Sequence, residues 1–220
     1  MNKYRCENNE KINGSGAYMG KSIEIIRHNL KYIIFAGVLL FVGAVIGGIL
    51  GDQLYGFIEE QLSKIQELGE KISANGNPLY ASWVIFWNNL QAALVFIILG
   101  SVFGIMPFLG LLLNGMLIGV VLSLVGDTAI SSLMVFAVGV LPHGIFEIPA
   151  ILIAGGFGLK LGTVWLKPIA GMKRWESFKY TWAEILDIIV FVVMLLVVAA
   201  LIEGLITPLL MNIFIGQLSV

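Results

Sequence analysis

The sequence predicts an all-α, polytopic membrane protein: a five-span helical bundle with a broken fourth helix. Of its 220 residues, 58% are hydrophobic and only 12% are charged, whereas charged residues make up about 25% of ordinary soluble domains. Five apolar segments reach the ~20 residues that a helix needs to cross a hydrocarbon core of ~30 Å. One of them, residues 128–162, is too long for a single upright helix and has prolines inside it.

The chain is predicted to form one compact bundle, residues 21–220, after a flexible cytoplasmic tail, residues 1–20. The tail is polar and ends in a run of Asn, Gly, Ser and Gly at residues 13–16, a composition that cannot bury enough apolar surface to fold alone. It shows no cleavable signal peptide, so we expect the first membrane helix to act as the insertion signal. The single cysteine, Cys6, rules out an internal disulfide framework.

A surface helix and span one come first. Apolar and charged residues recur at helical spacing between Lys21 and Leu30, which predicts a short amphipathic helix on the membrane surface. Span one follows at residues 32–50, with glycines at every fourth position: Gly43, Gly47, Gly51. This spacing lets helix backbones approach closely in lipid. Because four segments repeat it, packing within the bundle explains it better than a dimer interface, but a homo-oligomer stays open as an alternative.

Residues 52–77 form the one long polar connection. Apolar residues recur in it at helical spacing: Leu54, Ile58, Leu62, Ile65, Leu68, Ile72. The connection therefore predicts an outer amphipathic helix, which ends at the turn signal of residues 75–78. Two interpretations stay open for this helix: it lies on the membrane or docks on a partner, or it packs over the loops of its own bundle.

Spans two and three carry amides within apolar sequence. Span two, residues 81–103, begins with an aromatic cluster typical of the membrane interface and then has Asn88, Asn89 and Gln91. Span three, residues 108–125, has Asn114 in its first half. An unpaired amide in hydrocarbon costs several kcal/mol. We therefore expect Asn88, Asn89 and Asn114 to face the interior of the bundle.

Span four, residues 128–162, contains the predicted helix break. Pro142 has no N–H to bond to Val138 and its ring clashes with the preceding turn, while Gly144 relaxes the backbone. A second proline, Pro149, follows. We expect two half-helices that meet at His143. Irregular backbone at membrane depth must be covered by protein or line a water cavity, so this segment is predicted to occupy the centre of the bundle.

A basic loop and span five complete the chain. The loop, residues 160–179, mixes Lys and Trp, as expected for contact with anionic lipid headgroups rather than for a nucleic-acid site. Span five, residues 182–206, carries Glu184 and Asp187 near its start and Glu203 near its end. The last stretch, residues 207–220, is too short to span again, so it should lie in the outer interface or fold back on the bundle.

The basic residues predict the orientation in the cell membrane. Six lie at or before Lys31 and five lie between Lys160 and Lys179, with only Lys64 and Lys71 elsewhere. The positive-inside rule then places the N-terminus and the basic loop in the cytoplasm. Five crossings leave residues 52–77 and the C-terminus outside.

His143 and Glu147 are the candidate site residues. Their four-residue spacing puts them on one helical face, as suits a proton relay or a divalent metal. A metal site needs further ligands, and the candidates are Glu184, Asp187 and Glu203. The other interpretation is a buried polar centre in which His143 and Glu147 hydrogen-bond with the amides of spans two and three. The sequence has none of the common catalytic signatures of soluble enzymes, such as HExxH, GxSxG or a phosphate-binding glycine loop.

The chain resembles the stage II sporulation protein M family of integral membrane proteins over about residues 21–206. The residues that carry the resemblance are Asn88-Asn89-Leu90, Gly100 and Gly104, Asn114-Gly115 with Gly119, Pro142-His143-Gly144, Glu147, Pro149-Ala150, Gly155, Gly158-Leu159 and Gly162. The resemblance implies a non-enzymatic scaffold. In endospore-forming bacteria the namesake of the family works in a membrane complex with two cell-wall-degrading partners during engulfment.

Three functional hypotheses follow. The first is a membrane scaffold that anchors an envelope-remodelling complex by binding a membrane or extracytoplasmic protein through the outer helix. The second is an ion- or proton-coupled transporter that uses the helix break at His143 and Glu147, because broken helices commonly hold substrate sites. The third is an intramembrane enzyme that depends on a divalent metal.

Overall fold

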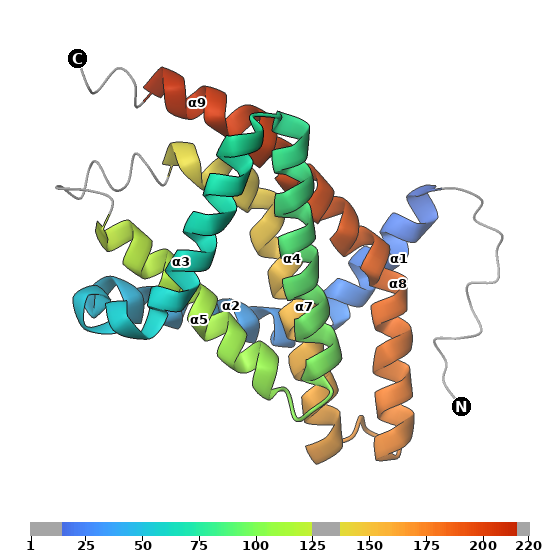
Figure 1. Ribbon diagram of the computed structural model, residues 1–220. Helices are drawn as coiled ribbons and strands as arrows, with labels where there is room; N and C mark the ends of the chain where they lie inside the picture. The colour runs from blue at the N-terminus through green and yellow to red at the C-terminus, as the bar shows by residue number, and fades with distance from the viewer. Residues whose placement is uncertain (1–14, 125–136, 215–220) are drawn as a thin grey trace.

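The computed structural model describes residues 15–124 and 137–214, and these residues are helical with no strand among them. The elements in chain order are α1 (Ser15–His28), α2 (Leu30–Ile49), α3 (Gly51–Asn75), α4 (Pro78–Gly100), α5 (Ile105–Leu124), α7 (Leu141–Leu166), α8 (Arg174–Leu201), the π-helix η2 (Ile202–Ile206) and α9 (Thr207–Phe214) (Figure 1). The predicted all-α class is confirmed.

The protein is a multi-pass membrane protein. Within the described residues, five helices are long and apolar enough to cross a membrane: α2, α4, α5, α7 and the continuous run of α8, η2 and α9. Large apolar side chains also stand exposed along these helices, among them Phe41 at 69%, Leu186 at 68% and Val190 at 64%. Soluble monomers rarely expose such continuous apolar surface, whereas a lipid-facing surface requires it.

The last span is longer than a membrane is thick. The run from Arg174 to Phe214 is 41 residues, or ~60 Å at ~1.5 Å per residue, against a hydrocarbon core of ~30 Å. The start of α8 and the end of α9 therefore extend beyond the hydrocarbon. The expectation that residues 207–220 form no separate span agrees with α9, an eight-residue helix; residues 215–220 lie outside the described part.

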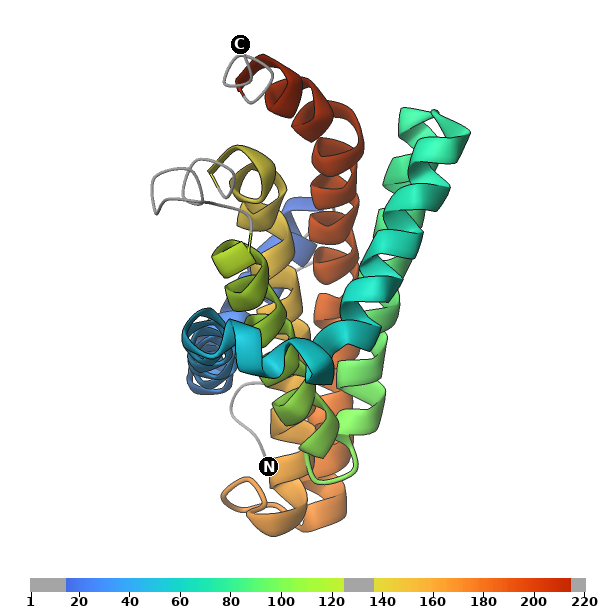
Figure 2. The ribbon, with the colours of Figure 1, turned by 60° about the vertical axis from the view of Figure 1, so that its left-hand side comes forward.

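Helix α7 is the centre of the bundle. Figures 1 and 2 show α4, α7 and α8 running along the long direction of the bundle, while α2 crosses it and is viewed almost along its axis in Figure 2. Ala154, Phe157 and Leu161 of α7 are no more than 1% exposed, and they share one apolar core with Ile188 and Val192 of α8. Fourteen residues of α7 are buried in all, as predicted for the segment that carries the helix interruption.

Glycines let α2 and α5 approach at backbone distance. A Cβ atom at Gly47 would lie 2.8 Å from the carbonyl carbon of Met116, and one at Gly115 would lie 2.9 Å from the backbone nitrogen of Ala44. Helices α4 and α7 make the same kind of contact, because a Cβ at Gly158 would lie 2.9 Å from the carbonyl carbon of Phe96. The prediction that these glycines serve packing within the bundle is confirmed.

The outer helix predicted at residues 52–77 is α3. It ends at Gly76, whose φ of 67° lies in the left-handed region that favours glycine at a helix C-terminus. The side chain of Asn77 then accepts a hydrogen bond of 2.9 Å from the backbone N–H of Leu79 and begins α4. The turn signal at residues 75–78 therefore works as the sequence predicts.

The start of α1 and the position of the interruption in the fourth span differ from the sequence-based expectation. Helix α1 begins at Ser15, inside the stretch expected to be tail. The interruption in the fourth span lies at Val140, which precedes α7, so His143 sits in the first turn of the second helix rather than at the junction. The helix tolerates Pro142 there because first-turn N–H groups have no helical partner in any case. The expected first half-helix falls mostly on residues 128–136, which lie outside the described part.

The basic loop is shorter than expected. The prediction that residues 160–179 form a loop is wrong. Helix α7 continues to Leu166 and α8 starts at Arg174, so only residues 167–173 connect them. Apolar residues lie between the charges and pack across the two helices: the rings of Trp165 and Phe178 have centroids 5.1 Å apart and are tilted by 41°. The expected loop is therefore mostly a helical hairpin, and aromatic contacts join its two helices.

Candidate functional site

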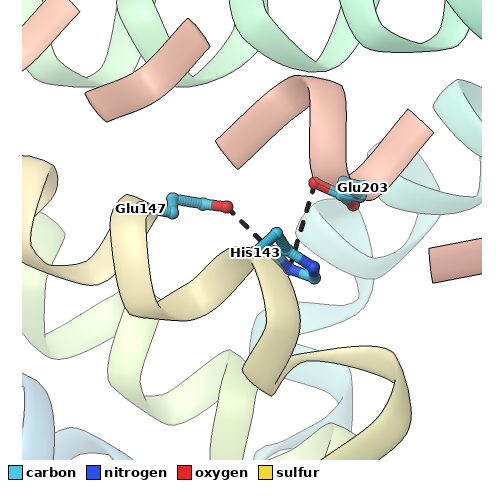
Figure 3. Close-up of side chains that lie close together, drawn as sticks. All are labelled: His143, Glu147 and Glu203. Carbon is cyan, nitrogen blue, oxygen red and sulfur yellow. Dashed lines mark ion pairs between the residues drawn. The ribbon is translucent and has the colours of Figure 1, made fainter. Parts of the chain in front are cut away.

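Three ionisable side chains meet near one end of α7, and we call them the His–Glu cluster: His143, Glu147 and Glu203 (Figure 3). His143 and Glu147 come from the first two turns of α7, and Glu203 comes from η2. The Nε2 atom of His143 lies 3.9 Å from Oε2 of Glu147 and 3.9 Å from Oε2 of Glu203. The sequence predicted the first pair, and Glu203 was one of the three further candidates.

The start of α7 places the side chains of His143 and Glu147 on the same face of the helix. Leu141 opens α7, and the N–H of Gly144 donates to the carbonyl of Val140 at 2.9 Å, which starts the helical hydrogen-bond pattern. From that start, residues four apart stand one above the other on the same face. The pair therefore projects from α7 toward η2.

A π-helical turn presents Glu203. In η2 the N–H of Thr207 bonds to the carbonyl of Ile202, five residues back, which widens the helix and shifts the direction of the side chains that follow. Such turns occur mostly as single insertions and often at functional sites. Gly204 holds the turn against α4, since a Cβ there would lie 2.8 Å from the backbone nitrogen of Ser82. The sequence pattern gave no signal for this π-turn.

The cluster combines a buried imidazole with partly exposed carboxylates. His143 is 9% exposed, and its Nδ1 is buried with no hydrogen-bond partner in the described part of the chain. The side chains of Glu147 and Glu203 are 26% and 31% exposed. A separation of 3.9 Å is too long for a direct hydrogen bond, but it accommodates one bridging atom, either a water oxygen or a metal ion.

Only one of the three predicted amides joins this centre. Asn89 is half-buried and lies near the Glu147 carboxyl group. The expectation of interior-facing amides is wrong for Asn88 and Asn114, which are exposed. Asn114 satisfies part of its amide on its own helix by donating to the carbonyl of Gly110 at 2.7 Å, so it does not need a partner from the bundle. It also lines, with Glu147, a groove of about 240 Å³ between α5 and α7.

The other two candidate metal ligands lie elsewhere. Glu184 pairs with Lys160 and accepts a hydrogen bond of 3.2 Å from Asn29, and Asp187 forms an ion pair of 2.8 Å with Lys21. Along α7, Lys160 is ~25 Å from His143 at ~1.5 Å per residue, too far for Glu184 to share an ion with the imidazole. These carboxylates join α1, α7 and α8 instead.

The network of Lys160, Glu184 and Asn29, which we call the buried ion-pair network, was missed in the sequence. Lys160 and Glu184 are 4% and 6% exposed, and the ammonium of Lys160 also donates to Oδ1 of Asn29 at 2.7 Å. Lys160 had been counted with the basic loop. The signal that identifies it is its place in an apolar, glycine-rich run, Gly155 to Gly162, where a lone charge must find a partner.

The His–Glu pair on α7 is expected to behave as a unit. His143→Ala and Glu147→Gln should each lower the free energy of unfolding by ~1–3 kcal/mol, because each removes one member of a partly buried polar pair whose groups lie 3.9 Å apart. The double variant should lose less than the sum of the two. Denaturant unfolding of the purified protein in detergent measures this, with His28→Ala at an exposed histidine as the control. Strictly additive losses would show that the two side chains do not interact.

Comparison with known proteins gives a family and two relatives. The model of a family described as "Stage II sporulation protein M" matches residues 34–208. An uncharacterized protein of Methanocaldococcus jannaschii, MJ0793, is 28% identical over 159 residues, which are 70% of this chain and 86% of the relative. A second from the same organism, MJ0706, is 28% identical over 193 residues, 81% of this chain and 82% of the relative. No solved structure matches.

Proposed function

The chain belongs to the stage II sporulation protein M family, and on that premise we propose that it is an integral membrane scaffold that recruits an envelope-remodelling protein through α3. The family resemblance implies partners rather than a reaction. The partner that we propose is an extracytoplasmic protein domain with a basic surface.

The observation that carries this proposal is the charged outer face of α3. The helix has five acidic and two basic residues, a net charge of −3. The exposed charged members of this face are Glu59, Glu60, Lys64, Glu67, Glu70 and Lys71. An acidic face of this length complements a basic protein surface.

Ion pairs within α3 keep this face helical and charged. Lys64 bonds to Glu60 at 2.7 Å, and Lys71 bonds to Glu67 at 2.7 Å, each pair one helical turn apart. The hydrogen bond from each lysine holds the pKa of its glutamate below the usual range. The carboxylates of Glu60 and Glu67 are therefore ionised near neutral pH, as electrostatic recognition requires.

The proposed orientation puts α3 outside the cell, with the N-terminus cytoplasmic and the C-terminus outside. The clusters of basic residues near α1 and in the hairpin between α7 and α8 support it through the positive-inside rule. Figure 1 is compatible with this orientation, because the turn from α3 to α4 and the turn from α7 to α8 lie at opposite ends of the bundle.

Site-specific photocrosslinking in the native cell tests the scaffold role. A photoreactive residue in place of Glu67 should give an adduct with one defined protein, whereas the same residue in place of Glu24, exposed on α1, should not. Reversing the charges on either side of Glu67, Glu60→Lys with Glu70→Lys, should abolish the Glu67 adduct, because the partner is held by charge. The proposal fails if Glu67 gives no protein adduct, or if its adducts survive the charge reversal.

The His–Glu cluster favours a second candidate function, ion- or proton-coupled transport. Its carboxylates are partly exposed beside a helix interruption, the arrangement found at many transporter sites. Proteoliposomes decide between the two: transport predicts ion or proton flux that His143→Ala abolishes, whereas a scaffold gives no flux above empty liposomes. The photocrosslinking result at Glu67 is independent of this measurement.

A further inference from the structure

We propose that the His–Glu cluster binds one divalent transition-metal ion, which ties α7 to η2. This inference does not depend on the scaffold role, because it concerns a cation site between α7 and η2 and not the exposed acidic face of α3. The ligands would be one imidazole nitrogen of His143 and one carboxylate oxygen each from Glu147 and Glu203.

The spacing of the three side chains suits an ion between them. One ligand atom from each lies within 4.8 Å of the other two, and both imidazole-to-carboxylate distances are 3.9 Å. Metal–ligand bonds of ~2.1 Å in tetrahedral geometry put neighbouring ligand atoms ~3.4 Å apart. The two imidazole-to-carboxylate distances would have to shorten by ~0.5 Å and the distance between the carboxylates by ~1.4 Å at most, changes within reach of flexible glutamate side chains.

In the described part of the chain, no hydrogen bond holds Nδ1 of the His143 imidazole, although this atom is buried and buried polar atoms are nearly always paired. The other ring nitrogen, Nε2, faces both carboxylates. An ion coordinated by Nε2 would fix the ring, which has no hydrogen bond at Nδ1 to hold it. Asn89, beside the Glu147 carboxyl group, is placed to orient that ligand, as polar groups next to metal ligands commonly do.

Charge balance favours a divalent ion. Two carboxylates side by side in a membrane bundle repel each other and lose hydration. A 2+ ion cancels both negative charges, and the N-terminal end of α7, where the cluster lies, also favours anionic ligands. Among the described residues, the buried lysine is Lys160, and it forms an ion pair with Glu184 rather than with the His–Glu cluster.

The ligand set indicates the class of metal. One nitrogen and two oxygen ligands suit Zn²⁺, Mn²⁺, Fe²⁺ or Co²⁺, whereas Mg²⁺ and Ca²⁺ prefer all-oxygen sites. Three protein ligands leave a coordination position open. The partial exposure of Glu147 and Glu203 lets an ion or a water molecule reach that position.

Zinc titration of the full chain tests the site. The protein is purified in detergent, stripped with a chelator, and titrated calorimetrically with Zn²⁺ and, separately, with Mg²⁺. One equivalent of Zn²⁺ should bind and Mg²⁺ should not compete at equal concentration. His143→Ala and Glu203→Gln should each weaken Zn²⁺ binding by more than about tenfold. His28→Ala and Glu67→Gln, which remove an exposed histidine and an exposed glutamate, should leave it unchanged.

Cobalt substitution provides a readout for variants of altered stability. Co²⁺ in the cluster should give visible absorption bands whose position shifts in Glu203→Gln, a near-isosteric change, and whose intensity is lost in His143→Ala. Circular dichroism and gel filtration establish that each variant is folded. The proposal is overturned if no saturable Zn²⁺ binding occurs, or if binding and the Co²⁺ bands are the same in both cluster variants as in the parent protein; a water-bridged or protonated cluster would give that result.

Discussion

Replacing Lys160 with methionine is expected to destabilise the bundle by ~3–5 kcal/mol, the cost of leaving one member of a buried ion pair without its partner. Glu184 is 6% exposed and would keep only Asn29 as a hydrogen-bond donor of the buried ion-pair network. The carboxylate must then remain charged in an apolar environment or take up a proton. Either outcome lowers the free energy of unfolding, which denaturant titration in detergent measures.

Two further variants separate the ion pair from general packing. Combining Lys160→Met with Glu184→Leu should recover most of the lost stability, because an apolar pair of similar volume is often as stable as a buried ion pair. Lys21→Met removes the matched surface pair with Asp187, whose side chains are 57% and 38% exposed, and should cost less than ~1 kcal/mol. Equal losses for Lys160→Met and Lys21→Met would contradict the burial argument.

Gly47→Leu is expected to break the contact between α2 and α5 and to cost ~3 kcal/mol or more, because the added side chain meets backbone that cannot rotate away. A Cβ at Gly47 would already lie 2.8 Å from the carbonyl carbon and 2.9 Å from the Cα of Met116. Thermal unfolding in detergent should show a lower midpoint and a smaller yield of folded protein.

The neighbouring glycine is the matched control. Gly48 is exposed, and the nearest atom to a Cβ there is the carbonyl oxygen of Gly119 at 3.9 Å, an ordinary contact. Gly48→Leu should therefore leave the midpoint within ~1 °C of the parent protein, since a stability change of 1 kcal/mol shifts it by ~2–4 °C at this size. If both leucine variants lose stability equally, the glycines of α2 do not act through close approach to α5.

Much of the fold was predictable because the sequence patterns that determine it lie within single helices or single turns. Apolar length identified the five spans, glycine spacing identified close helix packing within the bundle, and the turn signal at residues 75–78 marked the end of α3 and the start of α4. The helix interruption was foreseen from Pro142 but assigned three residues late. Proline fits without cost in the first turn of a helix, so the interruption comes before it, at Val140.

The site was only partly predictable because its partners come from distant elements. The spacing of His143 and Glu147 is visible in one helix, but Glu203 reaches them through a π-turn that has no sequence signature, and Gly204 positions that turn only once α4 is in place. The rule that polar residues in membrane helices face inward failed for Asn114, whose amide bonds to its own backbone. Lys160 was missed because it was assigned to the basic loop, although the sequence around it is apolar.

The scaffold role requires α3 and the hairpin between α7 and α8 to face opposite sides of the membrane, and cysteine labelling in intact cells tests this requirement directly. In a chain whose one native cysteine is removed by Cys6→Ser, Glu67→Cys and Lys173→Cys are introduced singly at exposed positions. A membrane-impermeant maleimide should label Glu67→Cys in intact cells and Lys173→Cys only after the cells are permeabilised. Labelling of both positions from the same side would contradict the five-span topology and, with it, the recruitment of an extracytoplasmic partner by α3.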